Sequence, residues 1–396
     1  MRYLNAMAQS LPNRTEKYIL SPLGASSEGY KALSRKITIL TLSIVLFGIV
    51  MIYSASSYGA KKDFGDSFYY VKKQAIAFLL GGAAMFGTSR LPTLLLKKFR
   101  YVILAISFAL LAVIFIPGVG VESYGARRWI NLGFMTIQPS EIAKFGYVVF
   151  AASYISERGV KRVCDLLRLG GVGLGMCLLI MLEPNMSITM CLLCVILFML
   201  LVGGIEIKKL LLLGIPIAVA VPVLIIMEPY RLKRLMAFLD PWASPKAEGY
   251  QLIQSYYALC RGGLFGVGLF QSRQKYLFLP FAESDFIFSV IGEELGLFGA
   301  ISVMTVFGGL VYFGFLTAAR AKNRYNALLA SGITSVIAVQ TTLNLAVVTG
   351  CIPPTGLPLP FISAGGSSLV SFMAAIGVLL SINREGGKSD LESHRM

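Results

Sequence analysis

Long apolar stretches, separated by short basic or polar connections, restrict this chain to one class of fold. Each stretch has close to the ~20 residues that a helix needs to cross the hydrocarbon layer of a membrane. Hydrophobic residues make up 56% of the chain and charged residues only 14%, too few charges for a soluble domain. The pattern predicts an all-α polytopic membrane protein with about ten transmembrane helices, at 37–56, 69–88, 101–117, 137–155, 168–183, 186–203, 208–227, 286–319, 325–349 and 366–383.

Lys and Arg residues near the ends of these spans predict the orientation. The loops on the side of both termini carry the denser basic clusters, for example at 97–100 and 320–324. We therefore expect both termini in the cytoplasm. The predicted organisation is a cytoplasmic tail at 1–36, a transmembrane domain at 37–384 and a second cytoplasmic tail at 385–396.

One outer connection, 228–284, is much longer than the others, and loops of this length are usually functional or disordered. Its aromatic residues and a basic cluster between 231 and 275 favour an ordered extracytoplasmic loop. An amphipathic helix on the membrane surface is expected near 250–261. Together with the net charge of +16, the outer basic residues indicate an anionic partner outside the cell rather than nucleic acid.

The few histidine and cysteine residues exclude several kinds of site. The single histidine, His394, lies in the C-terminal tail, so a histidine-based mechanism or a His-ligated metal is excluded. The six cysteines show no metal-ligand spacing and are read as small, mostly buried apolar residues. A disulfide between Cys260 and Cys351 is compatible with the predicted topology but is not expected.

An acidic run, LFLPFAESDFIFSVIGEELG at 277–296, leads into the eighth span. Asp285 lies at the outer mouth of the helix, where ordinary N-terminal capping would explain a carboxylate. Glu293 and Glu294 fall about two turns inside, where carboxylates are costly and usually face a polar cavity or a partner. At helical spacing Asp285 and Glu293 share one face. We favour a functional role for the run over capping alone.

A second motif, GARRWINLGFMTIQPSEIAKFG at 125–146, combines outer arginines with an intramembrane pair. Arg127 and Arg128 suit a phosphate or diphosphate, because the guanidinium fork matches phosphate oxygens. Glu141 and Lys144 are i,i+3 neighbours that can pair on one helical face. That pair could serve only to make two charges tolerable in lipid, and it could also line a cavity.

A third motif, GCIPPTGLPLPFISAGGSS at 350–368, contains too many prolines for a continuous helix. Irregular backbone at membrane depth survives where it lines a cavity or packs on protein. Ser367 and Ser368 open the last span with N–H groups suited to an anion. A plain re-entrant turn explains the motif equally well.

These motifs, together with DPW, GYQLIQSYYAL and QSRQK in the long loop, resemble in order and spacing the SEDS family of bacterial cell-wall polymerases. The resemblance covers nearly everything after residue 37, and it is stronger to the division branch of the family than to the elongation branch. It implies peptidoglycan glycosyltransfer from the undecaprenyl-diphosphate-linked disaccharide lipid II to a growing glycan strand in septal wall synthesis. The implied location is the outer face of the bacterial inner membrane, at the division septum.

The resemblance and the motifs together give the candidate site. Asp285 falls on the family's essential Asp and is the expected catalytic residue. Expected substrate-binding residues are Arg127, Arg128, Trp129, Gln138, Ser140, Glu141, Lys144, Gln274, Lys275, Glu293, Ser363, Gly365, Gly366 and Ser367. The sequence identifies no definite cofactor, but Mg²⁺ or Mn²⁺ could be shared between the substrate diphosphate and a carboxylate. The implied partners are a class B penicillin-binding protein transpeptidase and other membrane proteins of the division machinery.

This chain departs from the family pattern at three places. The usual PEAHTDF reads PFAESDF, so Glu283 stands where the family has His; Ala364 stands at the Tyr position of the usual SYGGSS; and Asn185 follows Pro184 where Asp is common. Two other classes of function compete with the enzyme. A flippase that moves lipid II across the bilayer would also use intramembrane charges and broken helices, and a non-catalytic division scaffold would use the tails and loops.

Overall fold

The computed structural model describes residues 26–123, 126–131, 133, 136–160, 163–206, 208–209, 214 and 229–393. The N-terminal residues 1–25, most of the predicted span 208–227, and His394 lie outside these ranges. The described helices are α3 (Ser27–Phe64), α4 (Tyr69–Arg90), α5 (Thr93–Lys98), α6 (Arg100–Val113), α7 (Pro139–Arg158), α8 (Val163–Leu182), α9 (Met186–Val202), α11 (Pro229–Leu239), α12 (Tyr250–Gly262), α13 (Ile287–Arg320), α14 (Arg324–Val348) and α15 (Gly366–Ser393).

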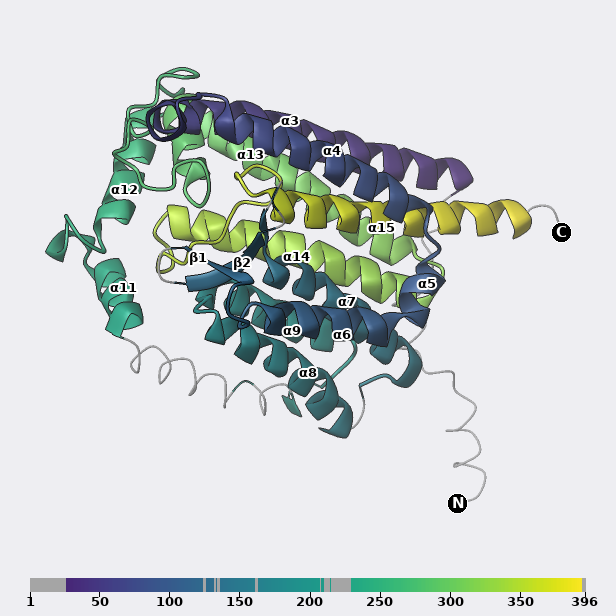
Figure 1. Ribbon diagram of the computed structural model, residues 1–396. Helices are drawn as coiled ribbons and strands as arrows, with labels where there is room; N and C mark the ends of the chain where they lie inside the picture. Colours follow the sequence, from purple (N-terminus) through teal and green to yellow (C-terminus); the bar gives the residue numbers. More distant parts are fainter. Residues whose placement is uncertain are drawn as a thin grey trace, which may run out of the picture.

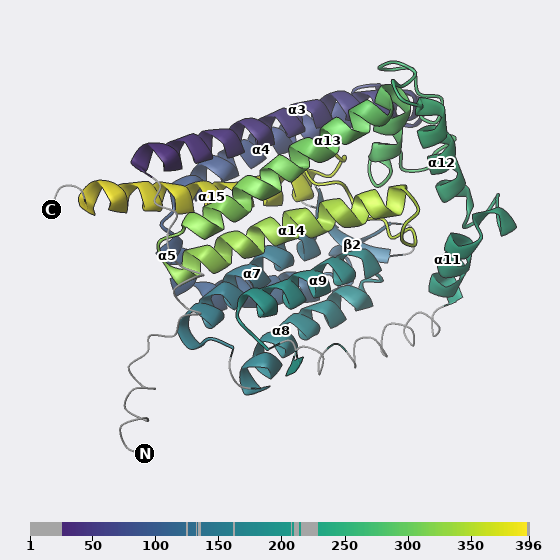
Figure 2. The same ribbon diagram turned by 180° about the vertical axis from the view of Figure 1, so that it is seen from behind.

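The long helices form one bundle with α14 and α15 in its interior (Figure 1). α15 packs against α3 and α4, while α14 packs against α7, α9 and α13. Figure 2, the view from behind, shows α14 running between α13 on one side and α7 and α9 on the other. α3 begins and α15 ends at the same end of the bundle as α5, which we call the inner end. α11 and α12 lie at the opposite, outer end.

Every predicted span except 208–227 coincides with a described helix, so the all-α fold class is confirmed. Five described helices, α3, α8, α13, α14 and α15, are long and apolar enough to cross a membrane, and α6 and α9 are apolar but shorter. The count of ten spans stays a prediction. The helix expected near 250–261 is present as α12, which packs against α13.

Two helices extend beyond the predicted transmembrane domain. α3 starts at Ser27, inside the segment expected to be a tail, because Ser26 caps it by accepting a hydrogen bond from the Gly29 N–H (3.3 Å). Buried Tyr30 then anchors this first turn by donating a hydrogen bond to the Arg320 carbonyl (2.7 Å). At the other terminus, α15 continues past residue 384 to Ser393.

A small antiparallel sheet at the outer end was not expected. It consists of β1 (Gly120–Ser123), β2 (Ala126–Asn131) and β3 (Thr136–Ile137), in the order β1-β2-β3. Hydrophobic spans dominated the sequence pattern, and these strands are short segments of the connection between α6 and α7. The sheet carries the Arg-Arg-Trp motif on its central strand β2.

The eighth predicted span is not one straight helix. α13 is broken at Gly296, which has φ 67° and ψ −166°. The break leaves helix carbonyls without their usual partners, and the preceding loop supplies them: Val267 N–H donates to the Glu293 carbonyl and Gly268 N–H to the Glu294 carbonyl (both 3.0 Å). A side chain at Gly296 would not fit, because its Cβ would lie 2.3 Å from the Gly266 nitrogen.

Candidate active site

Asp285 lies in a tight turn just before α13, whose N-cap residue is Phe286. The turn closes through the Ser284 N–H, which donates to the Phe281 carbonyl (3.1 Å). Asn344, in the interior helix α14, donates its side-chain N–H to the carbonyl of Asp285 (2.8 Å) and to that of Leu357 (2.6 Å). One buried amide therefore joins the Asp285 turn to the proline-rich segment 350–365.

The proline-rich segment holds the Asp285 turn from its other side. The Ser363 hydroxyl donates to the Ser284 carbonyl (2.6 Å) and accepts from the Leu359 N–H (2.8 Å). The Ala364 N–H donates to the Glu283 carbonyl (2.9 Å). Irregular backbone at this depth is thus bound to a second irregular segment rather than exposed to lipid, as the sequence predicted.

The Asp285 carboxylate itself is left open. It is half-buried, and no residue in the described part of the chain donates a hydrogen bond to it. Gly356 faces it with φ +69°, and a Cβ there would lie 3.1 Å from Asp285 Oδ2. Glycine therefore satisfies a strained backbone and keeps space in front of the carboxylate.

Burial raises the pKa of Asp285 to about 6, because the carboxylate loses water without gaining a donor. The positive charge of Arg234 opposes this rise most strongly, the negative charge of Glu283 adds to it, and Arg128 opposes it more weakly. Burial also raises the pKa of Glu283 itself. Asp285 is thus a carboxylate that is mostly ionised at pH 7 and accepts a proton more readily than an ordinary Asp, with two arginines acting on it electrostatically.

Arg128 connects β2 to the α8–α9 connection. Its Nε donates to the Glu183 carbonyl (3.1 Å), and its Nη2 contacts the Pro184 carbonyl. Arg127, the preceding residue, is exposed, and Trp129 is half-buried and pairs with Val121 across the β1–β2 ladder. The two predicted arginines therefore both lie on β2 at the outer end, and Arg128 is bonded to the α8–α9 connection.

Glu183 belongs to this region and was missed in the sequence. It lies directly after α8, is 1% exposed, and neither carboxylate oxygen has a hydrogen-bond partner among the described residues. Burial raises its pKa to about 8, against the opposing charge of Arg128. The signal that would have found it is a carboxylate at the outer end of an apolar span.

Arg234, the cation with the strongest effect on Asp285, was not singled out either. It lies on α11 in the long loop and donates from Nη1 to the Pro354 carbonyl (3.2 Å). Sequence spacing could not place it, because α11 and the proline-rich segment meet only through tertiary packing.

The predicted Glu141–Lys144 pair is present and fully buried, with Lys144 Nζ 3.1 Å from Glu141 Oε1. Gln340 of α14 also contacts the ammonium, and Ser368 donates its hydroxyl to Glu141 Oε2 (3.1 Å). The pair therefore joins α7, α14 and α15. Close by, the Gln138 N–H donates to the Ser367 hydroxyl (3.2 Å).

The remaining predicted residues of the 125–146 and 350–368 motifs lie where helices and loops pack together. Ser140 is buried, and its hydroxyl has no hydrogen-bond partner among the described residues. The Gly365 N–H donates to the side-chain oxygen of buried Gln74 (3.4 Å) on α4, and Gly366 begins α15. These residues lie together where α15 starts, beside the segment that holds Asp285.

Glu293 does not share a helical face with Asp285, because Asp285 precedes the helix. Its buried carboxylate accepts hydrogen bonds from the Ser272 hydroxyl (2.5 Å), from the Arg273 and Gln274 N–H groups, and from Arg261 (3.1 Å). The expectation of an internal partner is confirmed, and the partner is the 270–275 loop.

Glu294 is equally buried and equally well satisfied. It accepts from the Ser54 hydroxyl on α3 (2.6 Å) and from the Phe270 and Ser272 N–H groups (3.0 and 3.1 Å). Lys275, 6% exposed, lies with its Nζ 3.5 Å from Glu294 and 2.5 Å from the Phe270 carbonyl. Gln274 and Lys275 are thus placed with Glu293 and Glu294, apart from the Asp285 turn.

The described residues contain no group of three or more His, Cys, Asp and Glu side chains that could hold a metal ion. Cys260 and Cys351 are free thiols, and both are exposed.

Comparisons with known proteins agree with these features. Residues 34–388 match the model of the FtsW/RodA/SpoVE family, described as cell cycle proteins. The chain is 38% identical over 352 residues to the stage V sporulation protein E of Bacillus subtilis, covering 88% of this chain and 96% of that protein. It is 35% identical over 380 residues to the probable peptidoglycan glycosyltransferase FtsW of Saccharophagus degradans, covering 94% and 98%.

A solved structure reported under "Structural coordination of polymerization and crosslinking by a peptidoglycan synthase complex" contains a similar chain. The TM-score is 0.75 at 28% identity, with 88% of this chain and 97% of that chain covered. Sequence and fold comparisons thus agree over most of the chain. The chain belongs to the FtsW/RodA/SpoVE family, the SEDS family that its motifs resemble.

Proposed function

We propose that this protein is a peptidoglycan glycosyltransferase that polymerises lipid II into glycan strands at the outer face of the membrane. The observation that carries the proposal is the Asp285 carboxylate, which is half-buried, receives no hydrogen bond from the described residues and has a pKa raised to about 6. A carboxylate kept in this state costs stability, and such costs concentrate at catalytic sites. Relatives of similar length are named as probable peptidoglycan glycosyltransferases.

In the proposed reaction, Asp285 is the general base. It takes the proton from the 4-hydroxyl of the acceptor sugar while that oxygen bonds to the anomeric carbon of the donor. The bond from that carbon to the lipid diphosphate breaks, and undecaprenyl diphosphate leaves with the electron pair. One displacement inverts the α-linked donor to a β-1,4 product, so no covalent enzyme intermediate forms. Positioned general bases contribute about 10²–10⁴ to rate, most effectively with a pKa near the working pH.

The leaving diphosphate gains negative charge in the transition state, and fixed cations there lower the barrier. Arg128 and Arg234 are the candidates, since both act on the Asp285 carboxylate electrostatically. Exposed Arg127 extends the same positive surface. Lys275, expected in this role, is instead bonded to Glu294 and the Phe270 carbonyl. A divalent cation would be carried by the diphosphate, with Asp285 or Glu283 as its protein ligand.

The proposal includes a partner and a location. A class B penicillin-binding protein would crosslink the strands, which is supported by the similarity to a chain of a peptidoglycan synthase complex. The basic clusters at the inner end support cytoplasmic termini. Septal synthesis is supported by relatives named FtsW.

The test is to incubate the purified full-length protein with lipid II, with and without its penicillin-binding partner, and to separate the products by length. Glycan chains that depend on Asp285 support the enzyme. Redistribution of lipid II across liposomes without chains would identify a flippase. If neither glycan chains nor redistribution of lipid II is observed in the presence of the partner, the protein is a scaffold and the proposal is overturned.

A further inference from the structure

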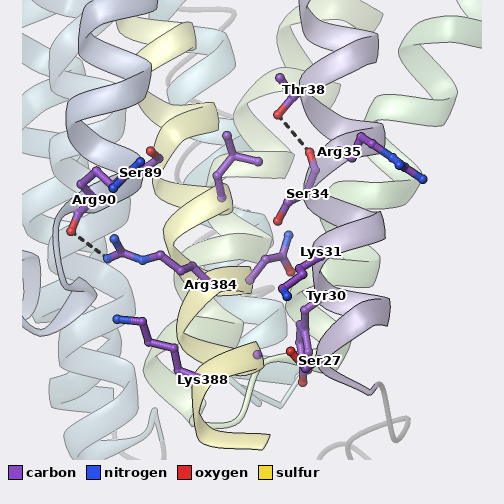
Figure 3. A pocket seen from close by; sticks show the side chains of 13 residues that line it. Ser27, Tyr30, Lys31, Ser34, Arg35, Thr38, Ser89, Arg90, Arg384 and Lys388 are labelled. Atoms are coloured by element: carbon purple, nitrogen blue, oxygen red, sulfur yellow. Dashed lines mark hydrogen bonds between the residues drawn. The ribbon is translucent and has the colours of Figure 1, made fainter. Parts of the chain in front are cut away.

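A pocket at the inner end of the bundle lies far from Asp285. It occupies about 460 Å³ between the first turns of α3, the end of α4 and the last turns of α15. This is within the volume range of small-molecule sites, about 300–1,000 Å³. Figure 3 shows Lys31 on α3, Arg90 on α4, and Arg384 and Lys388 on α15 around this space.

The pocket is lined by bases and hydroxyls and by no carboxylate. Its basic residues come from all three helices, and its hydroxyl groups come from α3 and α4: Lys31, Arg35, Arg90, Arg384 and Lys388, with Ser34, Thr38 and Ser89. None of the five bases forms an ion pair with an acidic residue in the described part of the chain.

The acid next to this cluster in the sequence is engaged elsewhere. Glu385 accepts hydrogen bonds from the Thr93 N–H (2.7 Å) and hydroxyl (2.6 Å) and from the Asn326 side chain (3.0 Å). Glu28, in the first turn of α3, also forms no ion pair with these bases. Among the described side chains, the pocket therefore has an excess of positive charge, which favours an anionic ligand.

The guanidinium group of Arg384 is positioned to bind such a ligand. Its Nη2 donates to the Arg90 carbonyl (2.7 Å), which fixes the guanidinium between α4 and α15. Its Nε is buried and has no hydrogen-bond partner among the described residues. A buried donor without a partner is unfavourable unless a ligand or water pairs with it. A phosphate oxygen matches this donor, because guanidinium groups bind phosphate in a planar fork.

Apolar surface lies directly beside the charged residues. Phe86 is one helical turn before Arg90 on α4, is 62% exposed, and has the Arg90 guanidinium 4.8 Å above its ring. Ile39, next to Thr38 on α3, is 55% exposed. On a membrane-spanning helix such side chains face acyl chains. A ligand here meets charge and hydrocarbon together.

We propose that this pocket binds the phosphate headgroup of an anionic phospholipid from the cytoplasmic leaflet. Basic pockets between transmembrane helices on that side bind such headgroups. A soluble phosphate would use the same arginine and lysine donors, but it would gain nothing from Phe86 or Ile39. The site is independent of the glycosyltransferase site at the outer end.

The test uses the full-length protein in a neutral detergent and a fluorescent phosphatidylglycerol as the probe. Binding is titrated by energy transfer or anisotropy, with labelled phosphatidylcholine as the zwitterionic comparison. Lys31→Gln/Lys388→Gln removes two exposed bases of the pocket that form no hydrogen bond or ion pair with the described part of the chain. Affinity for phosphatidylglycerol should fall about 30-fold, since each such base contributes about 1 kcal/mol. Arg384→Gln should have a comparable effect.

The matched control is Lys36→Gln/Lys98→Gln, which removes the same charge from the inner end outside the pocket. Lys36 stacks over Phe313 rather than facing the pocket. This variant should bind within about twofold of the wild type. An equal loss in control and pocket variants, or equal affinity for the two lipids, would overturn the proposal. Displacement of the probe by glycerol phosphate at the affinity of the lipid would make the ligand a soluble phosphate and overturn the lipid assignment.

Discussion

Two groups of carboxylates within ten residues of sequence are treated in opposite ways by this fold. Glu293 and Glu294 are completely buried, and backbone N–H groups, hydroxyls and cations of the 261–275 segment satisfy their oxygens. Asp285 receives only backbone support through Asn344, and its carboxylate is left without a described donor. The first arrangement stabilises a fold, and the second retains reactivity at a cost in stability. The presence of an acidic residue alone therefore does not identify a site. Whether its carboxylate oxygens have hydrogen-bond donors does.

The largest expected effect is on catalysis at Asp285. Asp285→Asn keeps the size and the backbone contacts of the residue but removes the base. Polymerisation of lipid II should fall by about 10²–10⁴, measured as glycan formed per minute by protein purified with its partner. Glycan synthesis at more than a tenth of the wild-type rate would contradict the role of general base.

The corresponding change at Glu294 should lower the stability of the fold. Glu294→Gln removes the charge that faces Lys275, and a broken buried pair costs about 3–5 kcal/mol. The melting temperature in detergent should fall clearly, while the folded fraction keeps its rate per molecule. Ser54→Ala, which removes one neutral donor to the same carboxylate, should cost only about 1 kcal/mol. An unchanged melting temperature for Glu294→Gln would show that the buried contacts of this region contribute little.

The pH profile separates the two regions further. A general base works when ionised, so the rate should fall as pH drops through about 6, the raised pKa of Asp285. Arg234 is the strongest influence that lowers this pKa, so Arg234→Gln should move the acid limb to higher pH. Glu294→Gln should leave the limb in place. If the acid limb of the pH–rate profile stays in place in Arg234→Gln, this arginine does not influence the pKa of Asp285.

A smaller effect is expected at Glu183. Burial raises the pKa of this carboxyl from its ordinary 4.5 to about 8. A folded-state pKa above the unfolded value gives stability that is present at low pH and lost as pH rises from about 4.5 to 8. Glu183→Gln should therefore be at least as stable as the wild type at pH 8, and its melting temperature should depend less on pH. Identical pH profiles would show that Glu183 finds a partner in solution.

The sequence predicts the spans well because a membrane helix must satisfy its own backbone and be apolar outside. The Glu141–Lys144 pair follows for a similar reason, since i,i+3 spacing is local geometry. The resemblance, rather than any spacing, pointed to Asp285. The prediction that Asp285 and Glu293 share one helical face was wrong, because Asp285 was assigned to a helix that begins after it.

Other features depend on contacts between distant segments. The break at Gly296 exists because the 263–268 loop supplies hydrogen bonds there, and no local pattern indicates which loop will do so. Arg234 and Glu183 reach the site from α11 and the end of α8. Their roles depend on contacts between segments far apart in the sequence, and residue spacing does not predict such contacts.

The most direct test compares Asp285→Asn and Glu294→Gln on the same preparations, measuring the melting temperature and the rate of lipid II polymerisation per folded molecule at pH 7. The account predicts a crossed result. Asp285→Asn should melt no lower than the wild type, because its raised pKa makes the ionised carboxylate a cost at this pH, and it should form almost no glycan. Glu294→Gln should melt lower and polymerise normally when folded. Loss of stability in Asp285→Asn together with normal polymerisation per folded molecule would contradict the account.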